Sequence, residues 1–497
     1  MKFRVERDVL GEAVAWVARA LPSRPVVPVL AGMLIEAGDG LVLSCFDYEV
    51  SARIRVDADV AEGGTALVPG RLLAEITRSL PTQPAEFTSS GEEVSLSCGG
   101  AEFTLVSLPA GDFPALPEPP PAAGTVDGGV LAAAAGQVVP AASRDDTLPM
   151  LTGVCLDFDG DTLTLAATDR YRLAVRELPW APADPDVRAV ALVPARTLAD
   201  VARTMTAGVP VTIAFGVGVG VGGVGSGVGV GGGGGGGQAA DGATRRGERR
   251  GGEPRPAKGM ISFEGGGRRL TARLIAGEFI RYRSRFPAEF GCRAEVAAGP
   301  FTEAVRRVSL VAERASPVRL AFGPDVVVVE AQAEGRARAV ETVAADFEGD
   351  EPVISFNPHY LLDGLAAVAA PASPRAAGAS GDGGGSGEAP PESGGRIRIE
   401  FTSPAKPALI TWAAGGGAAG GDSGQAVGGE PGGGAAGGDS GEAAGGDSDE
   451  VAGGDSDEAA GGDSDEAAGG ERGGEDSQAD VPAFRYLVVP LRMTARA

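Results

Sequence analysis

The feature that most constrains the fold is a sequence pattern that occurs twice, 122 residues apart. One copy is the stretch 41–54, LVLSCFDYEVSARI, and the other is 163–178, LTLAATDRYRLAVREL. In each copy, apolar alternation flanks a short polar segment that begins with an aspartate, Asp47 or Asp169. A period of two interrupted by a polar turn predicts a strand–turn–strand hairpin. Because 122 residues is the size of a domain, the chain is expected to contain repeated domains.

The order of the predicted elements indicates three such units. Helical spacing of apolar residues, with caps and prolines at the ends, predicts helices at 8–20, 70–80, 129–142, 194–205, 300–313 and 357–369. Strands are expected between them, among them 29–37, 211–215, 396–402 and 486–493. The fold class is therefore α+β, with three domains at 1–123, 124–290 and 291–497. In each domain two helices are expected to pack on antiparallel strands.

Three tracts of low complexity interrupt this plan. Residues 216–258 are rich in Gly and end in an arginine cluster, and residues 371–395 consist mainly of Ala, Gly, Ser and Pro. Residues 413–480 repeat the octapeptide AAGGDSDE, with 17 acidic residues against one arginine. None of the tracts can bury enough apolar surface to offset the entropy of ordering it, so all three are expected to be disordered loops. Weak Ca²⁺ binding by the acidic repeats is the less favoured alternative to a solvated loop.

Composition limits the possible partners and compartments. The net charge is −24, but most of it falls in 413–480, so the remainder of the chain can still present a basic face. The four cysteines stand far apart without a CxxC pair, which indicates buried thiols in a reducing compartment. The N-terminus lacks an apolar signal region, and the longest uncharged run is too rich in Gly for a membrane helix. We expect a cytoplasmic protein with no membrane association.

Catalytic signatures were sought and not found in the sequence. His359 is the only histidine, so neither a Ser–His–Asp triad nor a His-based metal site can be built. Its place after Asn357 and Pro358 indicates a capping or surface role at a helix start. No GxxxxGK[ST] phosphate loop occurs. The sequence therefore predicts no catalytic residues, no metal and no cofactor.

Several ordered segments carry a family resemblance. They are MKFRVERDVL at 1–10, SRPVVPVL at 23–30, FDYEVSARI at 46–54, VPGRLL at 68–73, LPAGDFPAL at 108–116, DDTLPMLTGV at 145–154, ATDRYRLAV at 167–175, NPHYLLDGL at 357–365 and YLVVPLR at 486–492. With these segments the chain resembles the bacterial DNA polymerase III beta subunit family, the replicative sliding clamps, in an actinobacterial style with added inserts. The resemblance implies a head-to-tail homodimeric ring that encircles double-stranded DNA without sequence preference. It implies a processivity factor, not an enzyme.

The resemblance also implies DNA contacts from arginines on helices and loops. Such a ring needs weak phosphate attraction that is blind to sequence, which exposed arginines supply. An ordinary role as solvated arginines stays open for each of them. The predicted DNA-binding residues are Arg24, Arg71, Arg78, Arg144, Arg196 and Arg203, with Arg306 and Arg307 on the first helix of the third unit.

Two protein interfaces follow from the same resemblance. The dimer junction is expected to bring Phe103 and Leu108 against Leu310 and Val311 of the next subunit. A pocket for clamp-binding peptides is expected between the second and third domains, with DNA polymerase III alpha subunit, the clamp loader and other proteins that carry such motifs as partners. Its predicted walls are Leu151, Thr168, Arg170, Tyr171, Arg172, Leu173, Pro407, Leu487, Val489, Pro490, Leu491, Arg492 and Met493.

Two positions depart from the family pattern, and other functions are possible. Ile280 and Arg285 stand where the family usually has a proline and a small apolar residue. A divergent clamp copy with impaired loading or a specialised repair role is the alternative within the family. A hydrolase or nucleotide-binding enzyme is disfavoured by the single histidine, and a secreted repeat protein by the ordered three-fold plan.

Overall fold

The fold was analysed in a computed structural model, which describes residues 1–205, 208–217, 255–312, 316–333, 335–350, 352–370, 395–413 and 484–491. Most of the three predicted disordered tracts, at 218–254, 371–394 and 414–480, lies outside these residues. Two strands nevertheless reach into the first tract. β16 (Pro210–Val217) and β17 (Arg255–Gly265) pair Gly216 with Lys258 and Val217 with Ala257. The predicted limits of 216–258 are therefore too wide.

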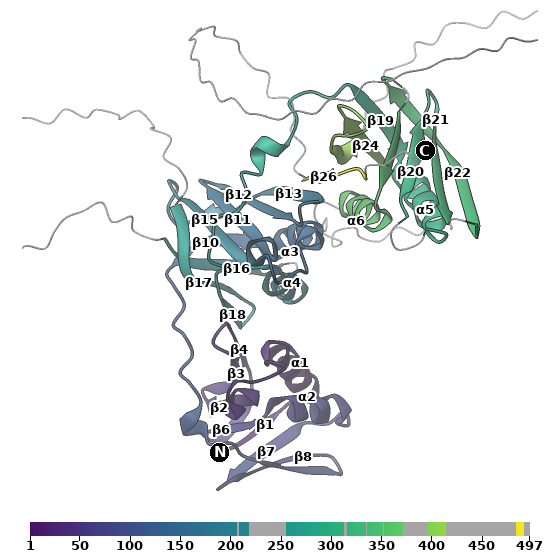
Figure 1. The fold of residues 1–497 in the computed structure, drawn as a ribbon. Helices are drawn as coiled ribbons and strands as arrows, with labels where there is room; N and C mark the ends of the chain where they lie inside the picture. Colours follow the sequence, from purple (N-terminus) through teal and green to yellow (C-terminus); the bar gives the residue numbers. More distant parts are fainter. Residues whose placement is uncertain are drawn as a thin grey trace, which may run out of the picture. The chain divides into compact units, whose positions relative to one another are not determined.

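The elements follow one order three times (Figure 1). A strand and a helix come first, then a run of antiparallel strands, a second helix and three closing strands. The first round comprises β1 (Lys2–Val5), α1 (Arg7–Val17), β2 (Gly32–Gly38), β3 (Gly40–Phe46), β4 (Val50–Val56), β5 (Asp59–Glu62), β6 (Gly64–Pro69), α2 (Gly70–Ser79), β7 (Ala85–Ser90), β8 (Glu93–Cys98) and β9 (Ala101–Val106).

The second and third rounds repeat this order with small changes. The second comprises β10 (Ala122–Asp127), α3 (Gly128–Val138), β11 (Gly153–Asp159), β12 (Thr162–Thr168), β13 (Arg172–Pro179), β14 (Ala181–Pro182), β15 (Arg188–Pro194), α4 (Ala195–Thr204), β16, β17 and β18 (Arg268–Arg273). The third comprises β19 (Cys292–Ala297), α5 (Ala298–Ser309), β20 (Val318–Phe322), β21 (Val326–Ala333), β22 (Ala337–Glu348), β23 (Val353–Phe356), α6 (Pro358–Ala369), β24 (Arg396–Phe401), β25 (Ala408–Ala413) and β26 (Phe484–Val488).

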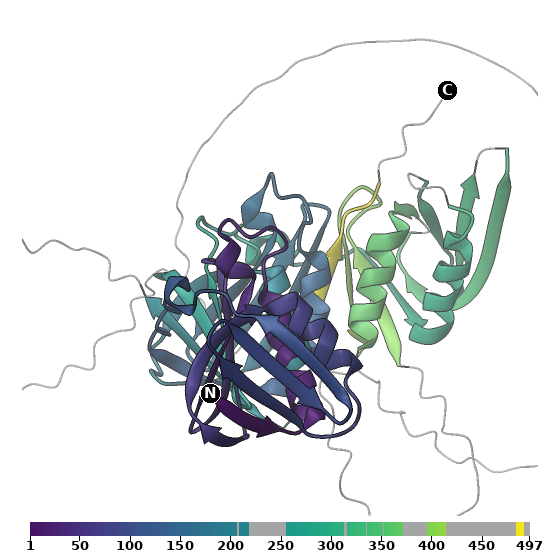
Figure 2. The ribbon, with the colours of Figure 1, turned by 90° about the horizontal axis from the view of Figure 1, so that it is seen from below.

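All six predicted helices are present. Within each round the two helices pack together, α1 on α2, α3 on α4 and α5 on α6 (Figures 1 and 2). Their buried sides carry the apolar residues that predicted them, such as Leu198 and Val201 on α4 and Phe301 on α5, all fully buried. At α6 the side chain of Asn357 accepts the amide of His359 at 3.0 Å, which caps the helix where the sequence indicated its start. His359 itself is exposed.

The strand predictions need correction in several places. The expected strand 29–37 begins only at Gly32, because Pro28–Ala31 forms a 3₁₀ turn that suits the fixed φ of its proline. The last strand ends at Val488 and not at residue 493, since Pro490 has no amide to donate to a sheet. The opening strand of each round, β1, β10 and β19, was missed. β10 and β19 are short and rich in small residues, so their alternation is weak in the sequence. β1 alternates, but it spans only four residues, too few to establish a period.

Strand pairing also runs between rounds. β4, the second strand of the first hairpin, pairs antiparallel with β18, the last strand of the second round. In the same way β13 pairs with β26, the last strand of the third round. The third round offers the corresponding strand in β22, which forms a long hairpin with β21 (Figure 2).

The cores are apolar and the thiols are free. Aromatic and aliphatic side chains such as Phe3, Phe87, Phe158 and Phe356 are almost wholly buried. Three of the four cysteines are buried, Cys292 is half-buried, and none forms a disulfide. The prediction of isolated core thiols is confirmed for Cys45, Cys98 and Cys155 but not for Cys292, which lies at the edge of the core.

Candidate functional site

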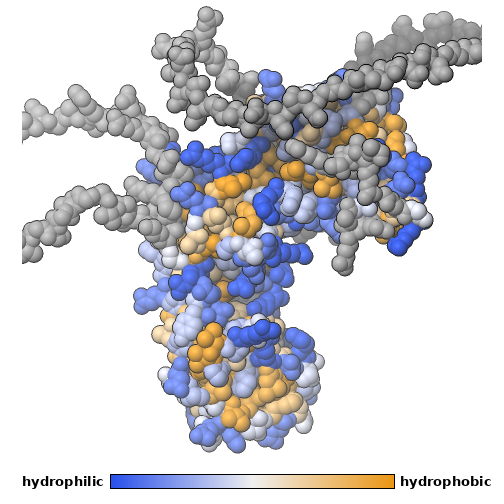
Figure 3. All heavy atoms as spheres, viewed as in Figure 1, coloured by the Kyte–Doolittle hydropathy of each residue, from blue (hydrophilic) through white to orange (hydrophobic). Residues whose placement is uncertain are grey.

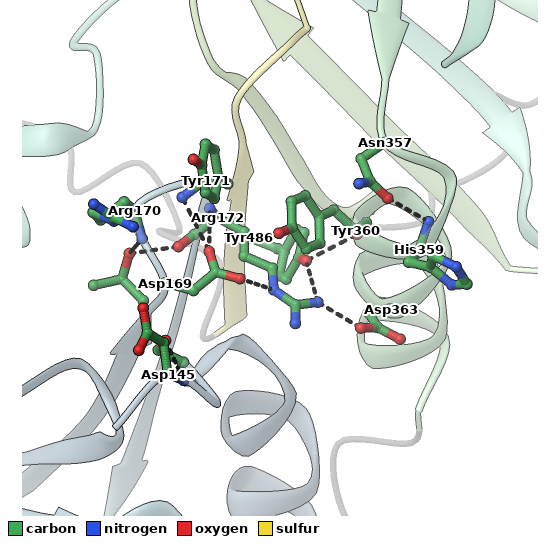
Figure 4. Close-up of polar contacts among 12 residues, drawn as sticks. Asp145, Asp169, Arg170, Tyr171, Arg172, Asn357, His359, Tyr360, Asp363 and Tyr486 are labelled. Carbon is green, nitrogen blue, oxygen red and sulfur yellow. Dashed lines mark hydrogen bonds and ion pairs between the residues drawn. The ribbon is translucent and has the colours of Figure 1, made fainter. Parts of the chain in front are cut away.

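The site is built on the turn between β12 and β13. Asp169 Oδ1 accepts hydrogen bonds from the amides of Tyr171 and Arg172, at 3.0 and 3.1 Å (Figure 4). Thr168 Oγ1 accepts the amide of Arg170 at 3.1 Å and donates to the carbonyl of Arg172 at 2.6 Å. Arg170 lies in the left-handed region, with φ 82°. Side-chain hydrogen bonds to the turn amides stabilise such a backbone, so the aspartate predicted as part of a hairpin turn defines its conformation.

Arg172 links this turn to the third round. Its Nε donates to Asp169 Oδ2 at 3.0 Å, and its Nη1 donates to Asp363 Oδ2 on α6 at 2.5 Å (Figure 4). The guanidinium also lies 4.7 Å from the ring centroid of Tyr360. The side chain is only 9% exposed. Burial disfavours its charge, but Tyr486, Asp363 and Asp169 more than offset this, and the pKa of Arg172 lies above its ordinary value. Arg172 is therefore held charged in one position.

Tyr486 on β26 completes the contact between the rounds. Its hydroxyl donates to the carbonyl of Tyr360 at 2.9 Å, and burial raises its pKa. Gly364 on α6 permits the close approach of the ring, because a Cβ there would collide with it. The strand β26 is thus fixed both to β13 and to α6.

A pocket of about 710 Å³ opens beside this turn. That volume falls in the usual range of ligand-binding clefts. Its walls come from the β12–β13 hairpin, the segment between β18 and β19, the β24–β25 turn and the end of β26. They are Leu151, Thr168, Arg170, Arg172, Leu173, Ile280, Ser284, Arg285, Phe286, Pro287, Thr402, Lys406, Pro407, Leu487 and Val489. Figure 3 shows apolar surface in the region where Figure 1 labels β12 and β13, with hydrophilic residues beside it.

The structure brings together eight of the thirteen predicted pocket residues: Leu151, Thr168, Arg170, Arg172, Leu173, Pro407, Leu487 and Val489. Tyr171, Pro490 and Leu491 are not among the lining residues. Tyr171 is 48% exposed and stacks on Tyr360 with ring centroids 5.9 Å apart. Arg492 and Met493 lie outside the described residues.

Sequence reasoning missed much of the wall formed by the segment 280–287. Ile280 and Arg285 were noticed only as departures from a family pattern, whereas Phe286 and Pro287 were not singled out. The clue was an apolar pair, Phe286–Pro287, directly after a basic run with arginines at 281, 283 and 285. Only the folded chain places this segment opposite Leu487.

The floor of the pocket is apolar and closely packed. Leu173 and Leu487 belong to a buried cluster with Leu409 and Tyr282, against which Phe286 packs. The hydroxyl of Tyr282 donates to Asp157 at 2.7 Å. Burial and the neighbouring carboxylate raise the pKa of this tyrosine, which keeps it a donor. The floor therefore offers an apolar surface to the side chains of a ligand.

The chemistry of the pocket is that of binding. Its lining includes no carboxylate, histidine or cysteine. Across the described part of the chain, no three His, Cys, Asp or Glu side chains gather closely enough to hold a metal ion. An apolar floor with a few polar groups at the rim suits an extended ligand with apolar anchors.

The other predicted site residues lie elsewhere. The six arginines predicted to bind DNA are all exposed. Arg71 donates to the carbonyl of Pro22 at 3.1 Å, and Arg203 pairs with Asp200 at 3.2 Å. On α5, Arg306 pairs with Glu303 and Arg307 with Glu341.

The predicted dimer residues occupy two separate surfaces. Phe103 is half-buried on β9, and the amide of Leu108 donates to the carbonyl of Leu67 at 2.7 Å. Leu310, after α5, is 82% exposed, and Val311 is half-buried. An apolar side chain as open as Leu310 is compatible with a protein contact.

Comparison with known proteins covers all three rounds. Family models of the DNA polymerase III beta subunit match the N-terminal domain at residues 1–117, the central domain at 125–280 and the C-terminal domain at 283–372. The chain belongs to the DNA polymerase III beta subunit family. Its sequence is 47% identical to the beta sliding clamp of Streptomyces coelicolor over 412 residues, which cover 83% of this chain and 94% of the relative.

Further relatives of this family agree. The beta sliding clamp of Micrococcus luteus is 42% identical over 349 residues, covering 70% of this chain and all of the relative. The crystal structure of the Bacillus subtilis sliding clamp superposes with a TM-score of 0.68 at 20% identity, covering 99% and 100% of the two chains. The predicted α+β fold of three clamp domains is confirmed.

The family assignment decides the general function. This chain is a DNA sliding clamp, a processivity factor of DNA replication without catalytic activity. Both sequence relatives are named beta sliding clamp, which does not favour the divergent-copy alternative. No helix in the described ranges is long and apolar enough to cross a membrane.

Proposed function

We propose that two copies of this chain close head to tail into a ring around double-stranded DNA and hold partner proteins through the pocket beside Arg172. The observation that supports the ring is the antiparallel strand pairing between consecutive rounds. The hairpin strands β4 and β13 each bind the last strand of the following round. The remaining hairpin strand is β22, and the remaining last strand is β9.

Both of these strands have an edge available. Among the described residues, β9 pairs along its length only with β8, and the first two-thirds of β22, Ala337–Ala344, only with β21. An unpaired strand edge is a template for another chain. We propose that β22 of one copy pairs with β9 of the next, as β4 pairs with β18 and β13 with β26 within one chain. Two such junctions between two copies would close the ring. Phe103, Leu108, Leu310 and Val311 are the proposed apolar contacts at that junction.

The oligomeric state tests this part of the proposal. Light scattering on the full chain after size exclusion should give twice the mass of one chain. Leu310→Asp should weaken the dimer, because it would place a charge in an apolar contact. Val26→Asp is a matched control, since Val26 is 90% exposed and belongs to neither edge. A monomeric full chain at micromolar concentration would refute the ring.

DNA is proposed to be held by exposed arginines. Arg24, Arg144 and Arg196 have no carboxylate within ion-pair distance in the described part of the molecule, so their charge is available to phosphates. Arg71, Arg78 and Arg203 are proposed to add to the same field. Contacts of this kind position a protein on DNA without reading its sequence.

The deciding experiment measures whether the protein is retained on circular DNA and released when the circle is cut. After loading onto nicked circular DNA, the protein should stay on the circle through gel filtration and leave when the circle is cut. Replacing Arg24, Arg144 and Arg196 by Glu should reduce loading and the salt dependence of binding, while Arg53→Glu, at another exposed unpaired arginine, should not. A protein that remains equally bound after linearisation would not be a topological clamp.

The pocket is proposed to bind short peptides of DNA polymerase III alpha subunit, the clamp loader and other proteins. Support comes from its apolar floor and the fixed position of Arg172. Tyr171, Pro490 and Leu491 are proposed to extend the contact beyond the pocket, together with Arg492 and Met493. A peptide with two apolar anchors should bind the full chain, and Leu487→Asp should abolish binding. With these partners, the protein is proposed to act in the cytoplasm, at the nucleoid.

A further inference from the structure

We propose that a cavity between the first and second rounds binds a small zwitterion that carries a guanidinium group. The cavity has a volume of about 240 Å³, the share of about eight water molecules in the liquid. It has no lining residue in common with the pocket beside Arg172, so the inference does not depend on peptide binding. It rests on a comparison of the first interface, between rounds one and two, with the second, between rounds two and three.

At the second interface this place is filled by the guanidinium of Arg172. The guanidinium lies between two carboxylates, with Nε 3.0 Å from Asp169 Oδ2 and Nη1 2.5 Å from Asp363 Oδ2. The ring centroid of Tyr360 is 4.7 Å away, and the hydroxyl of Tyr486 is 3.5 Å from Nη1. Two acids and two tyrosines therefore enclose one guanidinium.

Each of these residues has a counterpart at the first interface, by its place in the turn, on the last strand or on the helix before it. The pairs are Asp47 and Asp169, Val50 and Arg172, Leu270 and Tyr486, Thr197 and Tyr360, and Asp200 and Asp363. Leu270 faces the second residue after Val50 across β4 and β18. Tyr486 likewise faces the second residue after Arg172. The helix pairs are the third and the sixth residues of α4 and α6.

The exchanged side chains leave the first interface hollow. All five of its counterpart residues line the cavity. One arginine and two tyrosines are replaced there by a valine, a leucine and a threonine, so the groups that fill the second interface are missing. Both acids are kept. The cavity is therefore a space beside two carboxylates at the place where the second interface holds a guanidinium.

Polar groups at the cavity lack the partners that their position offers at the second interface. Thr197 is 2% exposed, and its Oγ1 has no hydrogen-bond partner in the described structure. Asp47 binds the turn amides through Oδ1, and no described residue donates to its Oδ2. Asp200 pairs with Arg203 at 3.2 Å, but burial raises its pKa and the neighbouring arginines offset this only in part. A buried hydroxyl without a partner indicates a missing ligand or water.

Two arginines bring the opposite charge to the same cavity. Arg19 and Arg196 line it, are exposed and form no ion pair with a described residue. They would repel a ligand that carried a guanidinium alone, but a carboxylate on the same molecule would pair with them. The buried side chains of Trp16 and Leu270 offer apolar wall to the methylene groups between the two charges. The lining therefore suits a zwitterion of the kind that free arginine represents.

The test measures binding of L-arginine to the full chain by isothermal titration calorimetry at about 50 mM NaCl, where charge pairs are weakly screened. L-Arginine should bind with a Kd below about 1 mM. L-Citrulline has nearly the same shape without the guanidinium charge and should bind at least about tenfold more weakly. Agmatine keeps the guanidinium without the carboxylate and should bind about threefold more weakly.

Two variants locate the ligand. Val50→Arg should abolish binding, because its own guanidinium would lie between Asp47 and Asp200 as that of Arg172 does at the second interface. Val56→Arg is the matched control and should bind L-arginine normally, since Val56 is a half-buried valine at the other end of β4 and does not line the cavity. Asp200→Asn should weaken binding about tenfold, which keeps the test decisive if Val50→Arg does not fold.

Four results would overturn the inference. Equal affinity for L-arginine and L-citrulline would show that the guanidinium is not recognised, and agmatine binding as tightly as L-arginine would refute the zwitterion. Full binding in Asp200→Asn or in a folded Val50→Arg would place the ligand outside the cavity. Absence of L-arginine binding up to about 10 mM would refute the site itself, while leaving the ring and the peptide pocket untouched.

Discussion

The turns at Asp47 and Asp169 share a backbone and differ in their surroundings. Each aspartate accepts hydrogen bonds from the amides two and three residues further on, at 3.0 and 2.6 Å in the first turn and at 3.0 and 3.1 Å in the second. The next residue is left-handed in both, with φ 72° at Tyr48 and 82° at Arg170. Each hairpin then gives its second strand to the last strand of the following round.

The difference lies in the residue that ends the turn. In the first turn this is Val50, an apolar residue that packs on the core. In the second it is Arg172, which reaches Asp363 and Tyr486 in the third round. Both hairpins therefore pair with the last strand of the following round, but only the second lines the proposed peptide pocket. The repeat accounts for the strand pairing, and the side chain at position 172 accounts for the site.

Replacing each aspartate by alanine should give the largest difference in stability between the two turns. Asp169→Ala should lower the free energy of unfolding by about 3 kcal/mol, because it removes two amide contacts and a partner of the buried Arg172. Asp47→Ala removes two amide contacts and no ion pair, so about 1 kcal/mol is expected. Urea unfolding measures both. Equal losses would mean that Arg172 does not depend on Asp169.

Exchanging the turn sequences tests whether the site resides in the side chains. The triple variant Arg170→Tyr, Tyr171→Glu, Arg172→Val places the residues of the first turn in the second. The fold should persist because Asp169 still defines the turn, but peptide affinity should fall about 30-fold, equivalent to about 2 kcal/mol. Fluorescence anisotropy with a labelled peptide that carries two apolar anchors measures this.

The matched control for that exchange is Tyr48→Arg with Glu49→Tyr in the first turn. Both residues are exposed there, and the pair should leave peptide affinity unchanged. Full affinity in the triple variant would show that the pocket needs only the hairpin backbone.

The sequence predicted the hairpins for a physical reason that also limits what it could show. Alternation and an aspartate in the turn are local signals, so both turns and all six helices could be located. The contact of Arg172 with Asp363 joins residues 191 positions apart. No local pattern specifies such a pairing, and the segment 280–287 entered the pocket only in the structure. β10 and β19 were missed because short strands of small residues carry little periodic signal, and β1 was missed because four residues are too few to establish a period.

The first hairpin has Cys45 where the second has Ala167, and this difference should affect the stability of the protein at alkaline pH. Burial, and to a smaller extent Asp47, raises the pKa of the Cys45 thiol from 9.0 to about 12. The folded state thus keeps its proton between pH 9 and 12 while the unfolded chain loses it, so stability is unaffected below pH 9 and falls above it.

At pH 10 this difference amounts to about 1.4 kcal/mol. Cys45→Ala, which copies the second hairpin, should therefore lose about that much less stability than the wild type between pH 8 and 10. Urea unfolding at the two pH values measures the change, and the buried Cys155 and Tyr486 are common to both proteins. Parallel losses in the two proteins would show that Cys45 ionises in the folded state.

Glycine at the left-handed positions should give the smallest effects and the finest distinction. Tyr48→Gly and Arg170→Gly each relieve a backbone cost of roughly 1 kcal/mol but increase the entropy of the unfolded chain, so each should change stability by less than about 1 kcal/mol. Function should separate the two variants. Arg170→Gly removes a cation that lines the pocket and should lower the affinity for a peptide with two apolar anchors about twofold to threefold, whereas Tyr48→Gly should leave it unchanged. If both variants kept the full peptide affinity, Arg170 would serve the turn alone and would not contribute to binding.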